Sequence, residues 1–236
     1  MNPPAPTDTF TPINIVLADA NVLYSRVLRD YLLYASVRRL ITIRWSQRIL
    51  NEMSENLIKN LPNFDHAAAD ALTRGMSEFF PNAMVEPTAE HYEVFRKLHM
   101  PDEDDRHVVA AGIAAGANIL CTSNIKDFPA DVMKRAGIQL VTPDMLLTSL
   151  AVNYPDKMEQ IHQTSVASLK GATDESTLAA LERADPHHKP PQRWPTYCHS
   201  SSFVPTYGRG TSFVPISADA DLLRAGRSPR IVVTAP

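Results

Sequence analysis

The sequence predicts an α/β protein in which helices cover both faces of a parallel sheet of about five strands. Two observations predict this class. Short apolar runs alternate along the chain with longer segments of helical periodicity, an order typical of parallel sheets. The runs are apolar at nearly every position, as expected for strands that are covered on both faces. The expected architecture is therefore a three-layer α/β/α sandwich.

Five segments have the length and composition of buried strands. They are residues 13–18 (INIVLA), 41–45 (ITIRW), a short stretch near 83–85, 119–122 and 138–141.

The helices expected between these strands have recognisable starts and ends. Ser25 is expected to cap the amphipathic helix after the first strand, in preference to Asp19, and Ser46 to cap the next helix. Gly116 is expected to end the small-residue helix at 108–115, because glycine readily adopts the left-handed conformation that ends helices. Thr142 and Pro143 begin the last helix of the domain. Further helical patterns cover residues 64–80, a segment from Thr88 to Leu98, 129–136, 158–169 and 176–184.

Composition limits the class of function. The chain of 236 residues contains 44% hydrophobic and 21% charged residues, which is ordinary for a soluble globular protein. A formal net charge of -3 gives no overall basic surface, so a nucleic-acid role depends on local charges or metal ions. The two cysteines form neither a disulfide framework nor a zinc pattern. With no signal peptide and no membrane-length apolar run, we expect a cytoplasmic protein with no membrane partner.

Four regions are expected along the chain. Residues 1–12 form a flexible N-terminus, and residues 13–150 form the α/β domain. Residues 151–184 form a C-terminal helical extension. Residues 185–236 are rich in proline and serine and have no helical or strand period, so we expect a disordered tail.

Polar and acidic side chains recur where α/β proteins bind ligands. Asp19 follows the first strand, Asn124 follows the fourth, and the acidic run Asp102–Asp105 opens a helix. In open α/β sheets, ligands bind outside the carboxyl ends of the strands. Taken alone, acids at a helix start simply complement the helix dipole, and Glu52, beside an apolar stripe, is of a kind usually solvated.

A cluster of these carboxylates has a chemical use. Carboxylates held together repel each other unless a cation lies among them. Mg²⁺ and Mn²⁺ favour such oxygen ligands, and they can activate water and stabilise the oxygens of a phosphoryl displacement. The combination therefore predicts a Mg²⁺ or Mn²⁺ site.

Four segments in this order resemble the PIN-domain nucleases, and specifically the toxin ribonucleases of VapBC-type toxin–antitoxin pairs. They are ADANVLYS, the helix with Glu52, DEDDRHVVAAGIAAGA and the strand ending CTSNIKDFP. The resemblance covers about residues 13–150. It implies a five-stranded parallel α/β/α sandwich and metal-dependent cleavage of RNA. It also implies partners: an RNA substrate, a cognate antitoxin protein and a second copy in a homodimer.

The resemblance implies which residues form the site. Asp19, Glu52 and Asp105 are its metal-binding catalytic acids, and Asp104 is able to share the role of Asp105. The family's fourth acid falls on Asn124, a departure from the pattern. Asp127 is then the candidate to supply the missing charge. Candidate RNA contacts are Asn21, Arg26, Arg106 and Lys126. His107 is expected to be solvated rather than a general base.

Two other interpretations are open. A response-regulator receiver domain also gathers acids around Mg²⁺, but it needs an acidic pair at the first strand end and a lysine after the fifth strand, and no lysine follows Val141. A catalytically impaired PIN-like module that binds RNA or protein is the main alternative. Asn124 is the residue that favours it.

Overall fold

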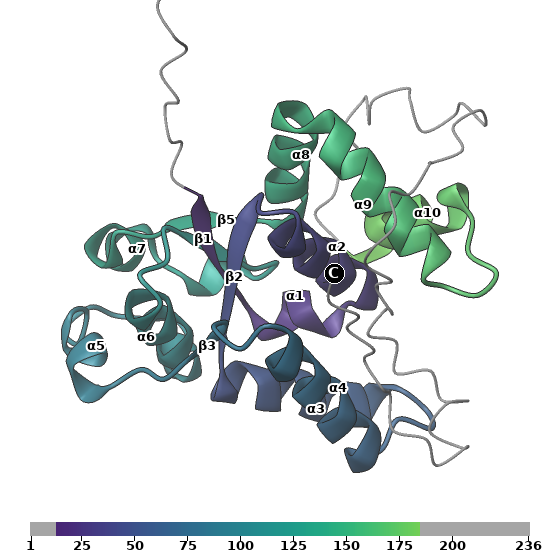
Figure 1. Ribbon diagram of the computed structural model, residues 1–236. Coiled ribbons are helices and arrows are strands. Elements are labelled where there is room, and N and C mark those ends of the chain that lie inside the picture. Colours follow the sequence, from purple (N-terminus) through teal and green to yellow (C-terminus); the bar gives the residue numbers. More distant parts are fainter. Residues whose placement is uncertain (1–12, 185–236) are drawn as a thin grey trace, which may run out of the picture.

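The computed structural model describes residues 13–184 (Figure 1). The expected flexible N-terminus (1–12) and disordered tail (185–236) lie outside the described residues.

Five strands form one sheet in the order β3-β2-β1-β4-β5, with every neighbouring pair parallel. This confirms the predicted fold class. Each strand is a predicted apolar run, and the central three are mostly buried because helices cover both sides. The strand bounds are β1 Asn14–Ala18, β2 Ile41–Ser46, β3 Met84–Val85, β4 Ile119–Cys121 and β5 Gln139–Val141.

The connections place β1 and β4 at a switch point of the sheet. From β1 the chain moves outward through β2 to β3, whereas from β4 it moves the opposite way to β5. Adjacent strands whose connections leave in opposite directions open a crevice at their carboxyl ends, where α/β proteins bind ligands. Ala18 pairs with Cys121 there, so Asp19 and Thr122 leave the sheet side by side.

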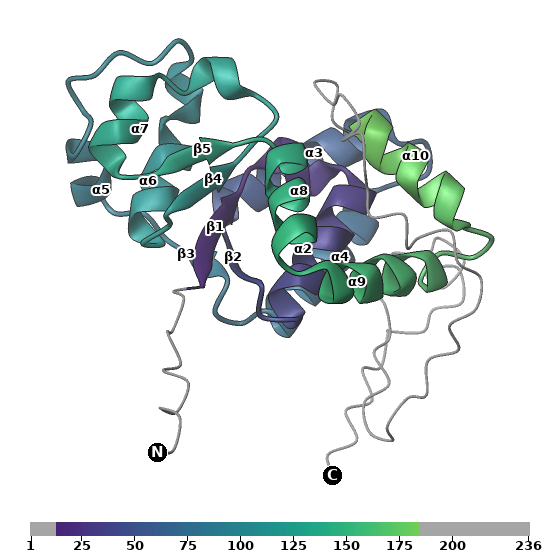
Figure 2. The same ribbon diagram turned by 90° about the horizontal axis from the view of Figure 1, so that it is seen from above.

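Helices cover both sides of the sheet (Figures 1 and 2). The two views show α5, α6 and α7 on one side, and α2, α8 and α9 on the other. The α-helices are α1 Ala20–Tyr24, α2 Arg26–Val37, α3 Gln47–Asn60, α4 His66–Phe79, α5 Ala89–Glu93, α6 Arg106–Ala114, α7 Ala130–Ala136, α8 Pro143–Asn153, α9 Pro155–Ala167 and α10 Asp174–Ala184; the 3₁₀ turns are η1 Glu103–Asp105 and η2 Ile125–Asp127.

The predicted caps are confirmed. The hydroxyl groups of Ser25, Ser46 and Thr142 each accept a hydrogen bond from the backbone three residues later. Asp19 also caps a helix, because its carboxylate accepts from the backbone N–H of Ala20 at 2.7 Å and begins α1. Only the Ser25 cap was predicted, since a helix of five residues is too short to show a period.

The helix expected from Thr88 to Leu98 is wrong in its second half. α5 ends at Glu93, and Phe95 is buried in the turn that follows. Arg106 holds this turn, because its guanidinium donates to the carbonyl of Leu98 at 2.7 Å and lies over the Phe95 ring.

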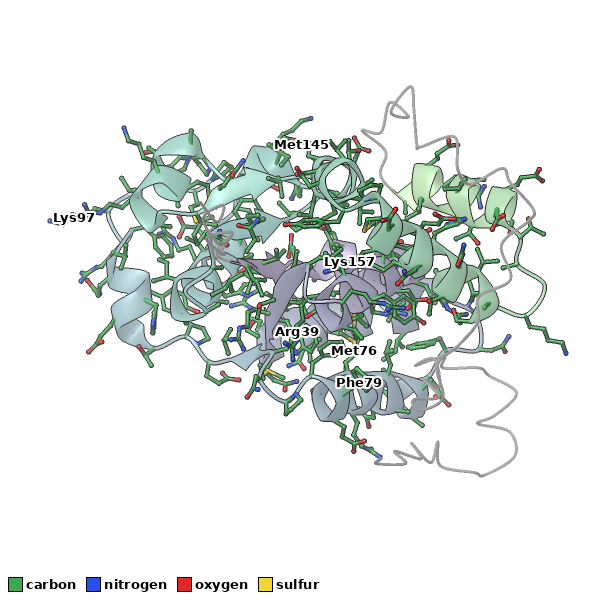
Figure 3. The ribbon with its side chains drawn as sticks, turned by 45° about the horizontal axis from the view of Figure 1, so that its top comes forward. Arg39, Met76, Phe79, Lys97, Met145 and Lys157 are labelled. Atoms are coloured by element: carbon green, nitrogen blue, oxygen red, sulfur yellow. The ribbon has the colours of Figure 1, made fainter. Side chains whose placement is uncertain are left out.

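One hydrophobic core lies between the layers and includes large side chains such as Trp45, Phe95 and Met76. Met76 on α4 is buried, whereas Lys97 and Met145 project outward (Figure 3). α6 packs closely on the sheet at Gly112, where an added Cβ would lie 2.7 Å from the end of the Ile138 side chain. Among residues 13–184, no helix combines the length and apolar composition that crossing a membrane requires.

The C-terminal helices α9 and α10 pack on α2 and extend this core. Met158, Ile161 and Leu181 are buried in the same cluster as the sheet residues. The contact also buries His162, whose Nδ1 is hydrogen-bonded to the hydroxyl of Tyr31 on α2. Its Nε2 lies 3.2 Å from a carboxylate oxygen of Asp174 on α10. His162 is therefore enclosed between three helices.

We expect this contact to make stability depend on pH. Burial lowers the pKa of His162 below its ordinary value of 6.5, although Asp174 works against the change. The unfolded chain then binds a proton at this residue more tightly than the folded protein. The free energy of unfolding should therefore fall as the pH drops through and below 6.5.

Chemical denaturation between pH 7.5 and pH 5 measures this dependence. His162→Gln should flatten it, whereas His66→Gln, a change at an exposed histidine of α4, should retain the slope of the wild type. Equal slopes in the wild type and His162→Gln would contradict the expectation.

Candidate active site

Asp19 lies at the centre of the candidate site. It directly follows β1, is buried, and receives hydrogen bonds on both carboxylate oxygens. Oδ1 accepts from the backbone of Ala20 at 2.7 Å. Oδ2 accepts from the hydroxyl of Thr122 at 2.7 Å and from the side-chain amide of Asn21 at 2.6 Å. Its position is therefore fixed from both sides of the crevice between β1 and β4.

Thr122 joins the ends of the two strands. While it donates to Asp19, its oxygen accepts from the Asn21 amide at 2.9 Å and from the backbone N–H of Asn124 at 3.0 Å. The side-chain oxygen of Asn21 in turn accepts from the backbone of Ser123 at 3.0 Å. One donor and two acceptor positions of the hydroxyl are thus all used.

Glu52 approaches from α3, the helix that follows β2. The apolar stripe of this helix packs inward, so Glu52 at its edge is only partly exposed. Oε1 lies 2.9 Å from Nε2 of His107 and 3.3 Å from Nε of Arg48. Partial burial acts to raise the pKa of Glu52, but His107 and Arg48 together outweigh it and lower the pKa.

The acidic run before α6 contributes Asp105. Asp105 is half-buried at the end of η1, whereas the Asp104 side chain is almost fully exposed, with one oxygen 3.7 Å from Arg48. Asp127, at the end of η2, is hydrogen-bonded to the side-chain amide of Asn124. Of the two neighbouring acids, Asp105 is the one turned toward the site.

Electrostatic coupling shows that the acids share one region. Burial, and after it the charges of Asp19, Asp102 and Asp127, together raise the pKa of Asp105 from 3.8 to about 6. Burial also raises the pKa of Asp19, hydrogen bonds from Thr122 and Ala20 oppose the change, and Glu52 adds to it. Four sequence-predicted acids, Asp19, Glu52, Asp105 and Asp127, are therefore near enough to influence one another.

The donor chemistry of this region suits a hard divalent cation. Repulsion among Asp19, Asp105 and Asp127 is a cost that a cation between carboxylates offsets. Throughout residues 13–184, however, no three His, Cys, Asp or Glu side chains are already grouped as a metal site.

One family model matches this region of the chain. Residues 15–126 match the PIN-domain family model. No curated protein and no solved structure matches the chain. The matched segment includes β1 to β4 and holds Asp19, Glu52, Asp105 and Asn124. The five-stranded parallel sheet between helices agrees with a PIN-like fold.

The candidate RNA contacts of the PIN-like region have different surroundings. Lys126 is exposed on η2, next to Asn124 and Asp127. Arg26 forms an ion pair at 3.9 Å with Asp30 on the same helix. Arg106 binds Glu103 and the turn before α6, and Asn21 binds Asp19 and Thr122. Arg106 and Asn21 are thus occupied with structural contacts, whereas the Lys126 side chain is exposed.

His107 was expected to be solvated, and this expectation is wrong. The residue is 2% exposed and contacts Glu52. The signal was present in the sequence, because the helix that follows is built of small apolar residues nearly all round, and such a helix is buried from its first turn. The roles of Arg48 and Thr122 were also missed. Arg48 stands four residues before Glu52, the spacing of a helical ion pair.

The raised pKa of Asp105 predicts a pH-dependent cost in the metal-free protein. Its value of about 6 lies above the ordinary 3.8, so the folded state holds this proton more tightly than the unfolded chain. Stability should therefore fall as the pH rises from about 4 to about 6. Asp105→Asn removes this loss, so its melting temperature should exceed that of the wild type at pH 7.5, with a difference that shrinks toward pH 4.

Calorimetric scans in the presence of a chelator measure the difference. Asp70→Asn, a change at an exposed acid of α4, is the matched control and should follow the wild type. An Asp105→Asn variant that is less stable than the wild type at pH 7.5 would show that Asp105 is stabilised rather than repelled in the folded protein.

Proposed function

We propose that the protein is a metal-dependent endoribonuclease that cleaves phosphodiester bonds of RNA. The observation that carries the proposal is the position of Asp19, Asp105 and Glu52 within a segment that matches the PIN-domain family model. PIN domains are generally nucleases, and the acids lie where parallel sheets bind their ligands. The coupling of their charges favours a divalent cation, Mg²⁺ or Mn²⁺.

The residues have distinct roles in this proposal. Asp19 and Asp105 are the main metal ligands, and Glu52 completes the set through its second oxygen. The cation would lower the pKa of a water molecule and stabilise the oxygens of the phosphate during displacement. Thr122 and Asn21 hold Asp19 in one orientation through hydrogen bonds of 2.6 to 2.7 Å. Such supporting contacts set the geometry of a metal ligand.

Asn124 and Asp127 are the two candidates for the fourth metal ligand, after Asp19, Glu52 and Asp105. The Asn124 amide is hydrogen-bonded to Asp127, and Asp127 is close enough to raise the pKa of Asp105. We infer that Asp127 supplies the charge that Asn124 lacks. We propose that Lys126, which is exposed and lies between them in the sequence, contacts a phosphate group of the RNA.

We propose that the chain is the toxin of a toxin–antitoxin pair, on the resemblance of its motifs to the VapBC-type toxins. A cognate antitoxin and a homodimer follow from the same resemblance. Light scattering of the purified protein measures the oligomeric state, and co-expression with the product of a neighbouring gene tests for an antitoxin.

The proposed role of Asp19 leads to the most direct loss-of-activity prediction. Asp19→Asn should lower Mn²⁺-dependent cleavage of a labelled RNA by at least about 100-fold, because removing a ligand should cost no less than removing its supporting contacts. The fold should persist, since the amide is nearly isosteric and removes a buried charge.

Asp70→Asn is the control for this assay and should cleave as the wild type does. Cleavage at the wild-type rate by a folded Asp19→Asn protein would contradict the mechanism.

Two complementary substitutions test which residue is the fourth metal ligand. If Asp127 supplies the fourth charge, Asp127→Ala should weaken Mn²⁺ binding about 10- to 100-fold, whereas Asn124→Asp should change it little. Calorimetric titration with Mn²⁺ compares the two. A marked gain of affinity in Asn124→Asp, with no loss in Asp127→Ala, would place the fourth ligand at position 124 instead.

A catalytically impaired binding module is the second candidate. Two observations favour it: Asn124 carries no charge, and Glu52 is already paired with Arg48 and His107. Binding of RNA by the wild type without any cleavage in Mn²⁺ or Mg²⁺ would support this alternative.

A further inference from the structure

We propose that His107 is a positioning residue, which holds one oxygen of Glu52 and thereby leaves the other directed to the cation. The inference rests on the proposed function and deepens it, because it concerns the same site. Nothing in the sequence pattern of the metal-binding acids includes this histidine.

The contact joins two helices that are distant in sequence. His107 is the second residue of α6, is 2% exposed, and places Nε2 2.9 Å from Oε1 of Glu52 on α3. Because the imidazole is packed in the core, it offers its nitrogen at a fixed place. A glutamate on a helix surface has several rotamers, and this contact selects one of them.

The second donor to Glu52 approaches the same oxygen. Nε of Arg48 lies 3.3 Å from Oε1, so both donors converge on one atom. Oε2 receives no hydrogen bond from any residue that the structure describes. A carboxylate with one oxygen held and one free is an oriented ligand for a hard cation.

Burial indicates that His107, rather than Arg48, determines the orientation. The Arg48 side chain is 53% exposed and also reaches Asp104, at 3.7 Å. Exposed ion pairs of long side chains contribute little, because solvent screens them and the side chains stay flexible. The His107 side chain is only 3% exposed, so its contact with Glu52 is screened far less by solvent.

The alternative is that His107 is an ordinary core residue whose Nε2 lies near Glu52 by coincidence. The Nδ1 atom of His107 argues against this, because it is buried and has no hydrogen-bond partner among the described residues. Buried polar atoms are nearly always paired, so an unpaired one indicates that something else fixes the ring. A leucine could occupy this buried position without that cost. The contact with Glu52 accounts for a histidine here.

Two variants separate positioning from packing. His107→Leu keeps an apolar side chain of similar size but removes the donor, whereas His107→Gln keeps an N–H group able to reach Glu52. Crystal structures of the metal-free variants should show the Glu52 carboxylate displaced in His107→Leu and retained in His107→Gln. If the leucine variant does not fold, His107→Met replaces it, because methionine adapts to irregular space.

Calorimetric titration with Mn²⁺ gives the second readout. His107→Leu should weaken Mn²⁺ binding about 10- to 100-fold, the usual effect of losing a contact that supports a metal ligand, and His107→Gln should restore most of it. His162→Gln is the matched control, because it alters a buried histidine of α9 and should leave Mn²⁺ affinity unchanged.

An unmoved Glu52 in the apolar variant, or equal Mn²⁺ affinity in that variant and the wild type, would overturn the proposal. A wild type that binds no Mn²⁺ contradicts the proposed function instead. In that case the position of Glu52 in the metal-free structures alone decides the role of His107.

Discussion

The parallel pairing of β1 with β4 determines the geometry of the candidate site. It brings Asp19 beside Thr122, two residues that are 103 positions apart, and the backbone N–H of Asp19 donates to the carbonyl of Cys121 at 3.1 Å. The connections of the two strands leave in opposite directions, so a crevice opens at this point of the sheet. The hydrogen bonds among Asp19, Asn21 and Thr122 then fix the carboxylate within it.

The acids around this crevice differ in how their charge is compensated. Asp19 is buried and hydrogen-bonded, yet its pKa stays raised, because hydrogen bonds from neutral groups do not replace the hydration of a full charge. Asp105 faces three other acids and has a pKa raised to about 6. Glu52, by contrast, has a lowered pKa through His107 and Arg48. The uncompensated charge therefore lies between Asp19 and Asp105, which is where a cation would stabilise the protein most.

The fold could be predicted from the sequence because its signals are local. Apolar runs marked the buried strands, and Ser25, Ser46 and Thr142 marked helix starts through contacts within three residues. The acids could be proposed from motif order, since residues 15–126 match the PIN-domain family model. The strand order, by which β1 pairs with β4, is set by long-range packing and could not be derived from periodicity.

The parts of the site that were missed depend on tertiary contacts. His107 follows four acids and was expected in solvent, but the small residues after it bring the start of α6 into the core. Its partner Glu52 lies on another helix, far earlier in the sequence, and no local pattern links the two residues. Asp127 was a candidate from the sequence, but its effect on the pKa of Asp105 arises only in the folded protein.

The central claim is that Asp19, Asp105 and Glu52 together bind a divalent cation at the carboxyl end of β1 and β4. An anomalous-difference map from a crystal of the wild-type protein soaked in Mn²⁺ tests it most directly. We predict a single strong peak between the carboxylates of Asp19 and Asp105, at about 2.1 Å or one water molecule from each, with Oε2 of Glu52 turned toward it. A map with no peak in this crevice, or with Mn²⁺ bound only at exposed acids such as Asp104, would contradict the account.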